Sequence, residues 1–321
     1  MSCAKTEFQE SHFTSFANLE GFRIMRAEIG KSSELHCQAL AQRFCMAFAL
    51  VVVLVFGATT ATARQDLIVP PSGFWVAPIK QGEGLYGATS EAANWHVTQW
   101  RSASSLSGFD HRGMATSANQ RIAMRGDGYE LEADGKSIPC NLEFDTFFGS
   151  NNNQGMFKGY PSAVSSDMSL AEMTSLIHTI ALHPVQEIDG GGKCSQRKAI
   201  YVTSIALRND RTQSTFFYQL RLRKYRTSLK PFWWDKGIDG KRYGFGDNLE
   251  SFGLSDVPMG SRRLVKVDLL PRIKQLLSDE RVSIDRDLSH WRIGTTYHGV
   301  AIWGDVKVKS KWDGYSLYAE P

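Results

Sequence analysis

After about residue 64 the chain consists mostly of short runs in which apolar and polar residues alternate, separated by turn-forming residues. The run "NWHVTQW" would place Trp95 and Val97 on one strand face and His96 and Thr98 on the other. Asp-Gly pairs in "RGDG" and "ADGK" are typical of hairpins and divide the segment from 120 to 149 into three strands. The runs "KAIYVTSIALRND" and "STFFYQLRLRKYR" flank a turn and predict another hairpin.

Two short helices interrupt this pattern. Between Ser169 and His183 the apolar residues follow helical spacing, and Ser169 with Glu172 forms a capping-box pattern. A second helix is expected after Asp268, a candidate cap, with Pro271 in its first turn. Many strands, few helices and no βαβ alternation predict an all-β, antiparallel β-sandwich with one or two short helices, formed by residues 64–321 as a single domain.

The first 63 residues differ from the rest. Arg43 is followed by "FCMAFALVVVLVFGA", an apolar run of about 15 residues, which is the length of a signal h-region. "ATA" at 61–63 matches a cleavage pattern, so we expect a signal peptide removed after Ala63 and a secreted or periplasmic protein. The segment before the run is long for a signal, which a true start at Met25 would explain. The alternative is an uncleaved signal anchor, the one case in which we expect a membrane partner.

The cysteines agree with export. Cys140 and Cys194 are the two that remain after the leader, and in an oxidising compartment they can form one disulfide. The alternative is two separately buried thiols. The net charge of +4 is mild and does not approach the dense basic surface of a nucleic-acid binder.

The stretch "LEFDTFF" places two carboxylates in an apolar run. Strand alternation puts Phe144 and Phe148 on one face and Glu143 and Asp145 on the other. Neighbouring like charges repel, so this pair requires a metal ion, an arginine, a shared proton or water to offset its charge.

"EFDTF" followed by an Asn-containing turn resembles the metal-binding stretch of legume-type lectins, which belong to the concanavalin A-like sandwich group. The resemblance implies that Glu143 and Asp145 hold manganese and calcium beside a sugar, with Phe147 offering its carbonyl. The sequence departs from that pattern at Gly149, where the lectins have Asn. The C-terminal run "WRIGTTYHGVAIWGDVKVKSKWDGYSLY" is also similar to the closing strands of secreted concanavalin A-like proteins, which implies a jelly-roll form of the sandwich.

The same Glu-x-Asp spacing resembles the catalytic strand of laminarinase-like glycosidases, which implies Glu143 and Asp145 as catalytic carboxylates. Phe147 and Phe148 stand where that family has its second Glu. A hydrolase would therefore recruit its acid elsewhere, and Glu187 with Asp189 in "QEIDGGG" repeats the spacing, although a solvated strand edge is the favoured alternative for this pair as well. Other acidic pairs, such as Glu130 and Glu132 in "YELE", fit a solvated strand edge better.

Aromatic residues are the stronger indication of a carbohydrate ligand, because flat rings stack on the apolar faces of sugars. The Gly-rich segment after residue 230 is the expected platform, and it contains Trp233, Trp234, Asp235, Tyr243 and Phe245. The alternative is an aromatic plug that closes one end of the sandwich. We expect the strand-located tryptophans to be core residues, namely Trp95, Trp100, Trp291 and Trp303.

Arg221 and Arg223 in "RLRKYR" alternate onto one predicted strand face, which could bind an anionic polysaccharide through bidentate pairs. A solvated face is the alternative. The sequence contains no HExxH, no GxSxG, no P-loop and no dinucleotide glycine pattern, which argues against zincins, serine hydrolases and nucleotide enzymes.

Three functions remain open. The first is an exported carbohydrate-binding β-sandwich, with calcium as the one cofactor under consideration. The second is a glycoside hydrolase or polysaccharide lyase on the same scaffold, in which Glu143 or Glu187 acts as nucleophile or acid. The third is an envelope protein whose aromatic segment contacts another protein.

Overall fold

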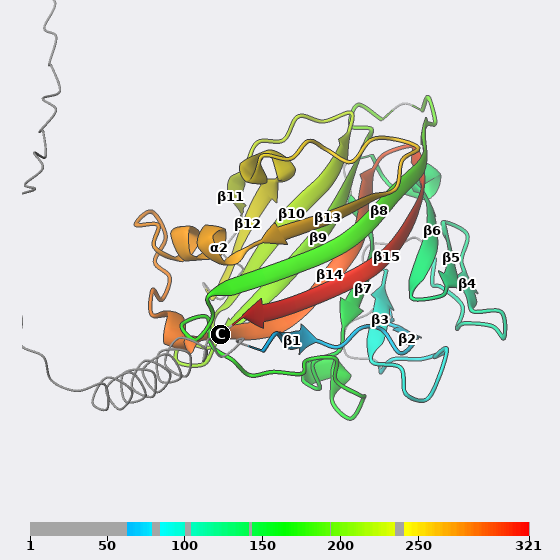
Figure 1. The fold of residues 1–321 in the computed structure, drawn as a ribbon. Coiled ribbons are helices and arrows are strands. Elements are labelled where there is room, and N and C mark those ends of the chain that lie inside the picture. The colour runs from blue at the N-terminus through cyan, green and yellow to red at the C-terminus, as the bar shows by residue number, and fades with distance from the viewer. Residues whose placement is uncertain are drawn as a thin grey trace, which may run out of the picture. The chain divides into compact units, whose positions relative to one another are not determined.

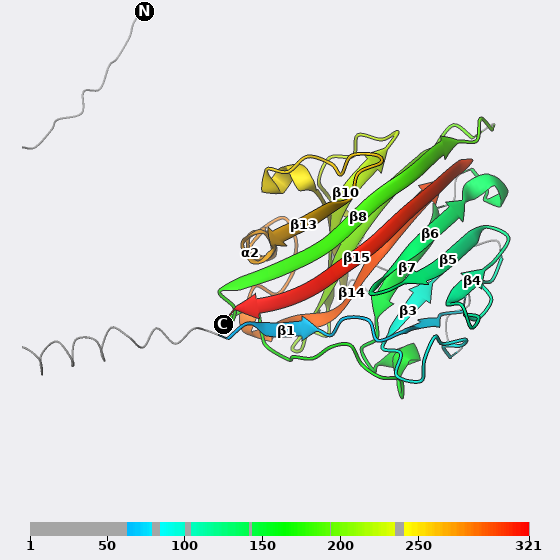
Figure 2. The same cartoon turned by 45° about the vertical axis from the view of Figure 1, so that its right-hand side comes forward.

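The chain folds into a two-layer β-sandwich. The computed structural model describes residues 63–78, 84–99, 104–140, 143–192, 194–234 and 241–320. Residues Thr62–Pro321 form one compact unit in which two sheets pack face to face (Figures 1 and 2). The predicted all-β sandwich is confirmed. The apolar run of the leader lies outside the described residues, and within them no helix is long and apolar enough to cross a membrane.

Sheet A is the seven-stranded layer. Its order is β13 (Arg263–Asp268), β8 (Ser175–Asp189), β15 (Val306–Glu320), β6 (Gly128–Asp134), β5 (Gln120–Arg125) and β4 (Met114–Thr116), with β1 (Gln65–Ile68) paired to β15. The pairs are antiparallel throughout. In Figure 2 the long strands β8 and β15 run side by side across the layer.

Sheet B is the eight-stranded layer. Its order is β11 (Phe232–Trp234), β12 (Arg242–Asn248), β10 (Thr215–Tyr225), β9 (Lys198–Asn209), β14 (Trp291–Trp303), β7 (Glu143–Ser150), β3 (Trp95–Thr98) and β2 (Phe74–Val76). The pairs β10–β12 and β2–β3 are parallel and the others are antiparallel. The predicted hairpin between β9 and β10 is confirmed.

The core lies between the two sheets and is rich in large aromatic side chains. Trp95, Trp291 and Trp312 are fully buried there, together with Phe148 of β7. Burial of such side chains removes a large apolar area from water, which is the main driving force for the packing of one sheet on the other.

The helix predicted between Ser169 and His183 is wrong, because most of this segment is strand β8. Leu176, His178 and Ile180 alternate into the core, and β8 pairs with β13 on one side and β15 on the other. The capping-box hydrogen bonds nevertheless form: the Ser169 amide and hydroxyl both donate to Glu172 Oε2, at 2.7 and 2.6 Å. They stabilise a turn, since sheet pairing on two edges outweighs a helical spacing of apolar residues.

The second predicted helix is confirmed as α2 (Leu270–Leu277). Asp268 Oδ1 accepts hydrogen bonds from the amides of Leu270 and Leu176, at 3.0 and 2.9 Å. Of the two Asp-Gly hairpins, "RGDG" joins β5 to β6 as predicted. "ADGK" instead leads into the 3₁₀ turn η1 (Gly135–Ser137).

Candidate functional site

Strand alternation gives sheet B two faces of different character. Phe144 and Phe148 of β7 point into the main core between the sheets. Phe147, on the same strand, belongs instead to a second apolar cluster with Ile200, Val202 and Ala301. We call the face that carries this second cluster, directed away from sheet A, the outer face of sheet B.

Strand register arranges the outer-face residues in four rows across the neighbouring strands. The first two rows are Glu143–Trp303–Lys198 and Asp145–Ala301–Ile200, and the next two are Phe147–Gly299–Val202 and Gly149–Tyr297–Ser204–Gln219. The two carboxylates thus share a face with an indole, a phenol, an amide and an ammonium group.

The first row combines three kinds of side chain. Trp303 lies between Glu143 and Lys198 in the register. The Lys198 ammonium nitrogen is 4.4 Å from the Trp303 ring centroid, a cation–π contact. The ammonium therefore lies over one face of the indole, and the row groups a donor, an aromatic ring and an acceptor that can contact a polyhydroxylated ligand.

The fourth row brings a phenol towards the carboxylates. Gln219 Nε2 donates a hydrogen bond of 2.7 Å to the Tyr297 hydroxyl, and the Tyr297 ring lies 5.2 Å from that of Phe147. Burial raises the pKa of Tyr297, and the negative charges of Asp145 and Glu143 raise it further. The phenol therefore stays protonated at neutral pH and remains a hydrogen-bond donor near the two carboxylates.

The middle of the outer face has small side chains. Gly299, Ala301 and Gly149 lie between the bulkier residues of the rows. A Cβ atom on Gly299 would lie 2.1 Å from the carbonyl oxygen of Thr146, so only glycine fits there. Phe147, Ile200, Val202 and Ala301 are buried here, and the rings of Tyr297 and Trp303 pack against this cluster.

The distance between Glu143 and Asp145 along β7 is compatible with paired carboxylate chemistry. Residues two apart on one strand have Cα atoms about 6.6 Å apart, with both side chains on the same face. This spacing is compatible with the range of about 5 to 9.5 Å between carboxyl groups that glycoside hydrolysis uses. Asp145 is buried and Glu143 is half-buried, so the pair lies at the edge of solvent.

The structure does not support the lectin-type metal site. Among the residues that it describes, no group of three or more His, Cys, Asp or Glu side chains could hold a metal ion. The Phe147 carbonyl, the expected backbone ligand, accepts a hydrogen bond from Thr98 Oγ1 at 3.2 Å inside the sheet. Calcium needs six to eight oxygen ligands, and Glu143 with Asp145 supplies too few.

The predicted aromatic platform is corrected by the structure. Trp233, Tyr243 and Phe245 belong to β11 and β12 and point into the main core, with Trp233 and Phe245 centroids 5.2 Å apart. Asp235 and the Trp234 side chain lie outside the described residues. β11 and β7 are separated by four strands in sheet B, which is about 24 Å from strand to strand. The rings are core residues because the segment pairs as strands instead of forming a loop.

The two predicted binding arginines do not share a face. A register shift between Arg221 and Arg223 disrupts the alternation of β10. Arg221 is buried on the outer side, where its Nη1 donates to Asn248 Oδ1 and the guanidinium lies 4.9 Å from the Phe232 ring. Its neighbours hold it in place, so it is not part of an exposed stripe.

Arg223 and Glu187 pair with each other. The guanidinium donates two hydrogen bonds of 2.7 Å to the Glu187 carboxylate, which is 2% exposed. Glu187 lies on β8 of sheet A, whereas Glu143 lies on β7 of sheet B. The structure thus does not bring the two predicted catalytic glutamates to one face.

The prediction that the strand tryptophans are core residues is confirmed for Trp95 and Trp291 and wrong for Trp303. Trp100 lies outside the described residues. Sequence reasoning also missed Tyr297, Lys198 and Gln219. Alternation in "TTYHGVAIW" could have grouped Tyr297 with Trp303, but only strand order shows that β14 and β7 are neighbours.

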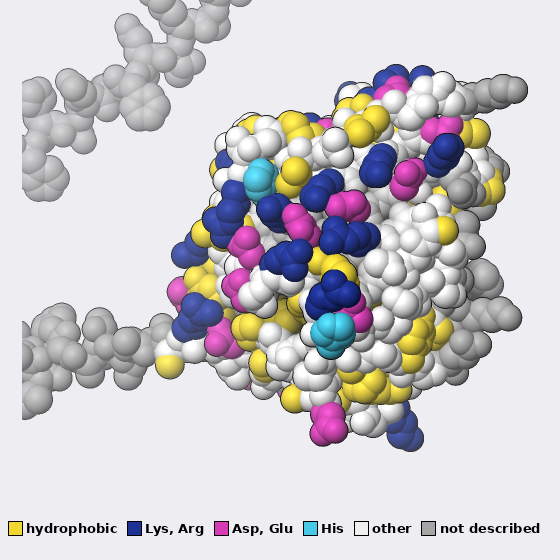
Figure 3. All heavy atoms as spheres, turned by 90° about the vertical axis from the view of Figure 1, so that its right-hand side faces the viewer, with side chains coloured by type: hydrophobic (Ala, Val, Ile, Leu, Met, Phe, Trp, Pro, Cys, Tyr) yellow, Lys and Arg dark blue, Asp and Glu magenta, His cyan; other side chains and the backbone are white. Residues whose placement is uncertain are grey.

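The acidic pair in "YELE" lies on the outer side of sheet A. Glu130 contacts Lys309 and Lys311 at 3.8 and 3.4 Å, and Glu132 pairs with Lys309 and Arg121 at 2.8 and 3.4 Å. Figure 3 shows basic and acidic side chains interspersed on the side of the molecule formed by β4, β5 and β6. This is the solvated strand face expected as the alternative.

A polar groove of about 290 Å³ lies away from the carboxylate rows. Its lining includes Asn152, Ser166, Asp167, Arg208 and Gly294, at the opposite end of β9 and β14 from Glu143. Arg208 and Asp167 form an ion pair of 2.5 Å within it. The groove is thus a feature distinct from the four rows.

Comparison with known proteins gives similarity at the level of the fold. No protein-family model and no curated protein matches the sequence. A family 12 xyloglucanase from Bacillus licheniformis covers 67% of this chain and 99% of its own, with 9% identity and a TM-score of 0.45. The endo-1,4-β-glucanase CelB2 covers 80% of this chain and 100% of its own, with 12% identity and a TM-score of 0.40.

A family 11 xylanase from Neocallimastix patriciarum is similar over 71% of this chain and 96% of its own, with 8% identity and a TM-score of 0.40. These similar structures are glycoside hydrolases, and the similarity is weak, as the resemblance found in the sequence is. At these scores the likeness concerns the fold, and the activities of those enzymes are not transferred to this chain.

Proposed function

We propose that this protein binds a carbohydrate polymer along the outer face of sheet B. The observation that carries the proposal is the placement of Glu143, Asp145, Tyr297 and Trp303 on one face, around the apolar cluster of Phe147, Ile200, Val202 and Ala301. Aromatic rings that contact sugar C–H faces, with carboxylate and phenol groups beside them for the hydroxyls, are the chemistry that saccharide recognition requires.

A polymer fits this face better than a single sugar unit. The rows cross β7, β14, β9 and β10, which are consecutive in sheet B. Neighbouring strands are about 4.8 Å apart, so the polar positions from Glu143 to Gln219 extend over roughly 14 Å across the sheet. A ligand that contacts both ends must be longer than one monosaccharide.

We also propose that the protein is exported from the cytoplasm. A polysaccharide ligand outside the cell requires a protein that leaves the cytoplasm, and the Cys140–Cys194 disulfide suits an oxidising compartment. Cleavage after Ala63 remains a prediction. It is supported by the exposure of Ala63 and Arg64, which lie just before β1.

A glycoside hydrolase is the second candidate, and the spacing of Glu143 and Asp145 favours it. On β14 and β9 the outer-face positions next to this pair are Ala301, Gly299 and Ile200, which have no ionisable group. Glu143 and Asp145 are the carboxyl groups among the described outer-face residues of these three strands, so the acid–base pair of a hydrolase would fall to them, with Tyr297 and Lys198 as the other ionisable side chains of the four rows. An envelope protein that contacts another protein is the third candidate, and it predicts no glycan binding.

A single set of assays separates these functions. We would screen the purified chain on a glycan array and in a reducing-sugar assay, with and without calcium, beside Glu143→Gln and Asp145→Asn variants. Binding without sugar release, lost in both variants, would support the proposal. Release of reducing ends that Glu143→Gln abolishes would establish the hydrolase.

The matched control is Glu132→Gln, which changes a carboxylate on the outer side of sheet A. It should leave both readouts unchanged. A folded protein that neither binds nor cleaves any glycan would overturn both carbohydrate functions. Calcium-dependent binding would contradict our conclusion that the Glu143–Asp145 pair has too few ligands for a metal ion.

A further inference from the structure

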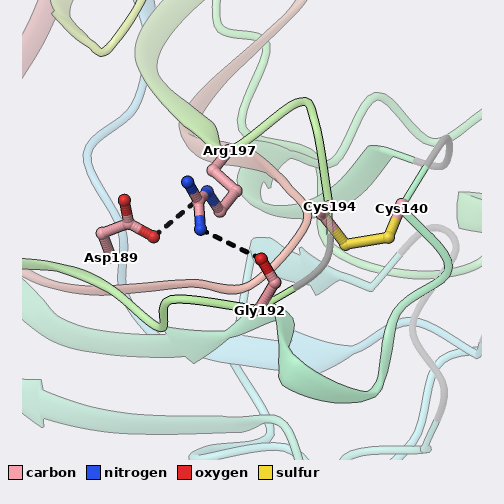
Figure 4. Close-up of a disulfide and its surroundings, with 5 residues drawn as sticks. All are labelled: Cys140, Asp189, Gly192, Cys194 and Arg197. Carbon is pink, nitrogen blue, oxygen red and sulfur yellow. Dashed lines mark hydrogen bonds and ion pairs between the residues drawn. A yellow bond between two sulfur atoms is a disulfide. The ribbon is translucent and has the colours of Figure 1, made fainter.

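The predicted disulfide forms, and it joins the two segments that enter the site. Cys140 lies just before the start of β7 at Glu143, and Cys194 lies just before the start of β9 at Lys198. Their Cα atoms are 5.0 Å apart, and Figure 4 shows the bond between the two loops. β7 and β9 are the strands on either side of β14, so the bond spans the end of the first row.

The bonded loops also enclose the turn that follows Trp303. A Cβ atom on Gly304 would lie 2.3 Å from the carbonyl oxygen of Gln196 and 2.9 Å from Cys194 Cβ. From the other side, a Cβ atom on Gly135 would lie 2.0 Å from the Gly304 carbonyl oxygen. The β14–β15 turn is therefore in van der Waals contact with both segments that the disulfide connects.

Polar contacts hold the same loop by a second means. Arg197 Nη1 donates a hydrogen bond of 3.0 Å to the Gly192 carbonyl, and its Nε lies 3.2 Å from Asp189 Oδ1 (Figure 4). These contacts do not involve either cysteine, so they persist when the disulfide opens. Loss of the bond should therefore loosen the strand ends without releasing the whole sheet.

The first row needs such support because of its position. Glu143 and Lys198 are the first residues of their strands, and Trp303 is the last residue of β14. Strand ends open locally at low free energy because fewer neighbouring hydrogen bonds hold them. A covalent link just outside the row restricts this opening on both sides of Trp303.

We infer that the Cys140–Cys194 disulfide is a positioning element for the Glu143–Trp303–Lys198 row, so that opening it weakens carbohydrate binding while the sandwich stays folded. The inference rests on the proposed function for its ligand. In the opening step, a dithiol reduces the S–S bond to two thiols and is itself oxidised to a cyclic disulfide. Carbohydrate binding on the outer face of sheet B therefore weakens when a thiol reductant opens the disulfide.

The test uses the full chain with soluble xyloglucan, xylan and polygalacturonate as probes. It compares the oxidised wild type with a Cys140→Ser/Cys194→Ser double variant, and both with samples treated with dithiothreitol. A Ser195→Ala variant changes an exposed neighbour of Cys194, keeps the disulfide and is the matched control. Hydrogen exchange of the backbone amides near Glu143 and Lys198 is measured in every sample.

We expect at least about tenfold weaker binding in the double variant and in the dithiothreitol-treated wild type. Exchange should accelerate at the starts of β7 and β9 and stay slow in β8 and β15. The control variant should bind like the wild type until dithiothreitol is added. Equal affinity with and without the disulfide would overturn the inference, as would unchanged exchange at the two strand starts or faster exchange throughout the chain.

If the oxidised wild type binds neither the three probes nor any glycan on the array, the proposed function fails. The positioning claim is then decided by hydrogen exchange alone, which needs no ligand.

Discussion

Gln219 on β10 donates a hydrogen bond to the Tyr297 hydroxyl on β14, across the intervening strand β9. The bond fixes the phenol on the outer face of sheet B, on the side of the two carboxylates. Because Tyr297 and Gln219 come from strands that are not neighbours, this contact links three strands of the proposed binding face.

Tyr297→Phe should weaken carbohydrate binding roughly three- to tenfold, which corresponds to one hydrogen bond of about 0.5–1.5 kcal/mol. The free energy of unfolding should fall by a similar amount. Tyr243→Phe is the matched control, because that hydroxyl donates to the Ser283 carbonyl on the core side at 2.6 Å. Tyr243→Phe should leave the carbohydrate affinity unchanged in isothermal titration calorimetry. An equal loss of affinity in the two variants would contradict contact between the Tyr297 hydroxyl and the ligand.

Arg223→Ala should destabilise the protein by about 3–5 kcal/mol, because it leaves the buried Glu187 carboxylate without its partner. Replacing both members, as Arg223→Met with Glu187→Leu, should recover most of this loss. Urea unfolding of Arg223→Met, Glu187→Leu and the double variant measures the coupling energy between the two residues. If the losses in unfolding free energy of the two single variants simply add in the double variant, Arg223 and Glu187 do not stabilise the fold as a pair. A catalytic role of Glu187 would appear as lost turnover in the double variant, which stays folded.

Three buried histidines should make the fold acid-sensitive. Burial lowers the pKa of His178 and His96 to about 4 and that of His298 to about 3. The unfolded chain binds protons near pH 6.5 and the folded chain does not, so stability is complete above about pH 6.5 and falls as the pH decreases towards 4.

The expected slope is about 1.4 kcal/mol per pH unit for each histidine, measured by urea unfolding between pH 7 and 4.5. Most carboxylates titrate below this window. His96→Gln should reduce the slope by the share of one histidine, with Asn151 still within hydrogen-bonding reach of the new amide. A flat stability profile from pH 7 to 5 would contradict neutral burial of these rings.

Gly299→Ala should destabilise the protein by about 1–3 kcal/mol or more, because the added methyl group meets the Thr146 carbonyl in the neighbouring strand. Gly294→Ala, on the same strand, is the control, since its nearest contact would be the Ala206 carbonyl at 3.3 Å. Thermal unfolding compares the two. If Gly294→Ala costs as much as Gly299→Ala, glycine is needed for flexibility of β14 and not for the close contact with β7.

Local sequence determined several parts of this structure. Alternation in "LEFDTFF" placed Glu143 and Asp145 together on one face of β7, because successive strand residues point to opposite sides. The turn between β9 and β10 and the helix α2 follow from short-range signals in the same way. These features depend on residues close together in the chain, so one sequence is enough to predict them.

Tertiary structure decided the rest. The segment around Ile177 has helical spacing but lies between β13 and β15, and pairing on both edges makes it a strand. Which carboxylates and rings share a surface depends on strand order: β14 pairs with β7, which brings Trp303 and Tyr297 to Glu143, whereas β11 and its Trp233 lie at the far edge of the sheet. Strand order is set by the burial of side chains distant in sequence, and periodicity within a run carries no information about it.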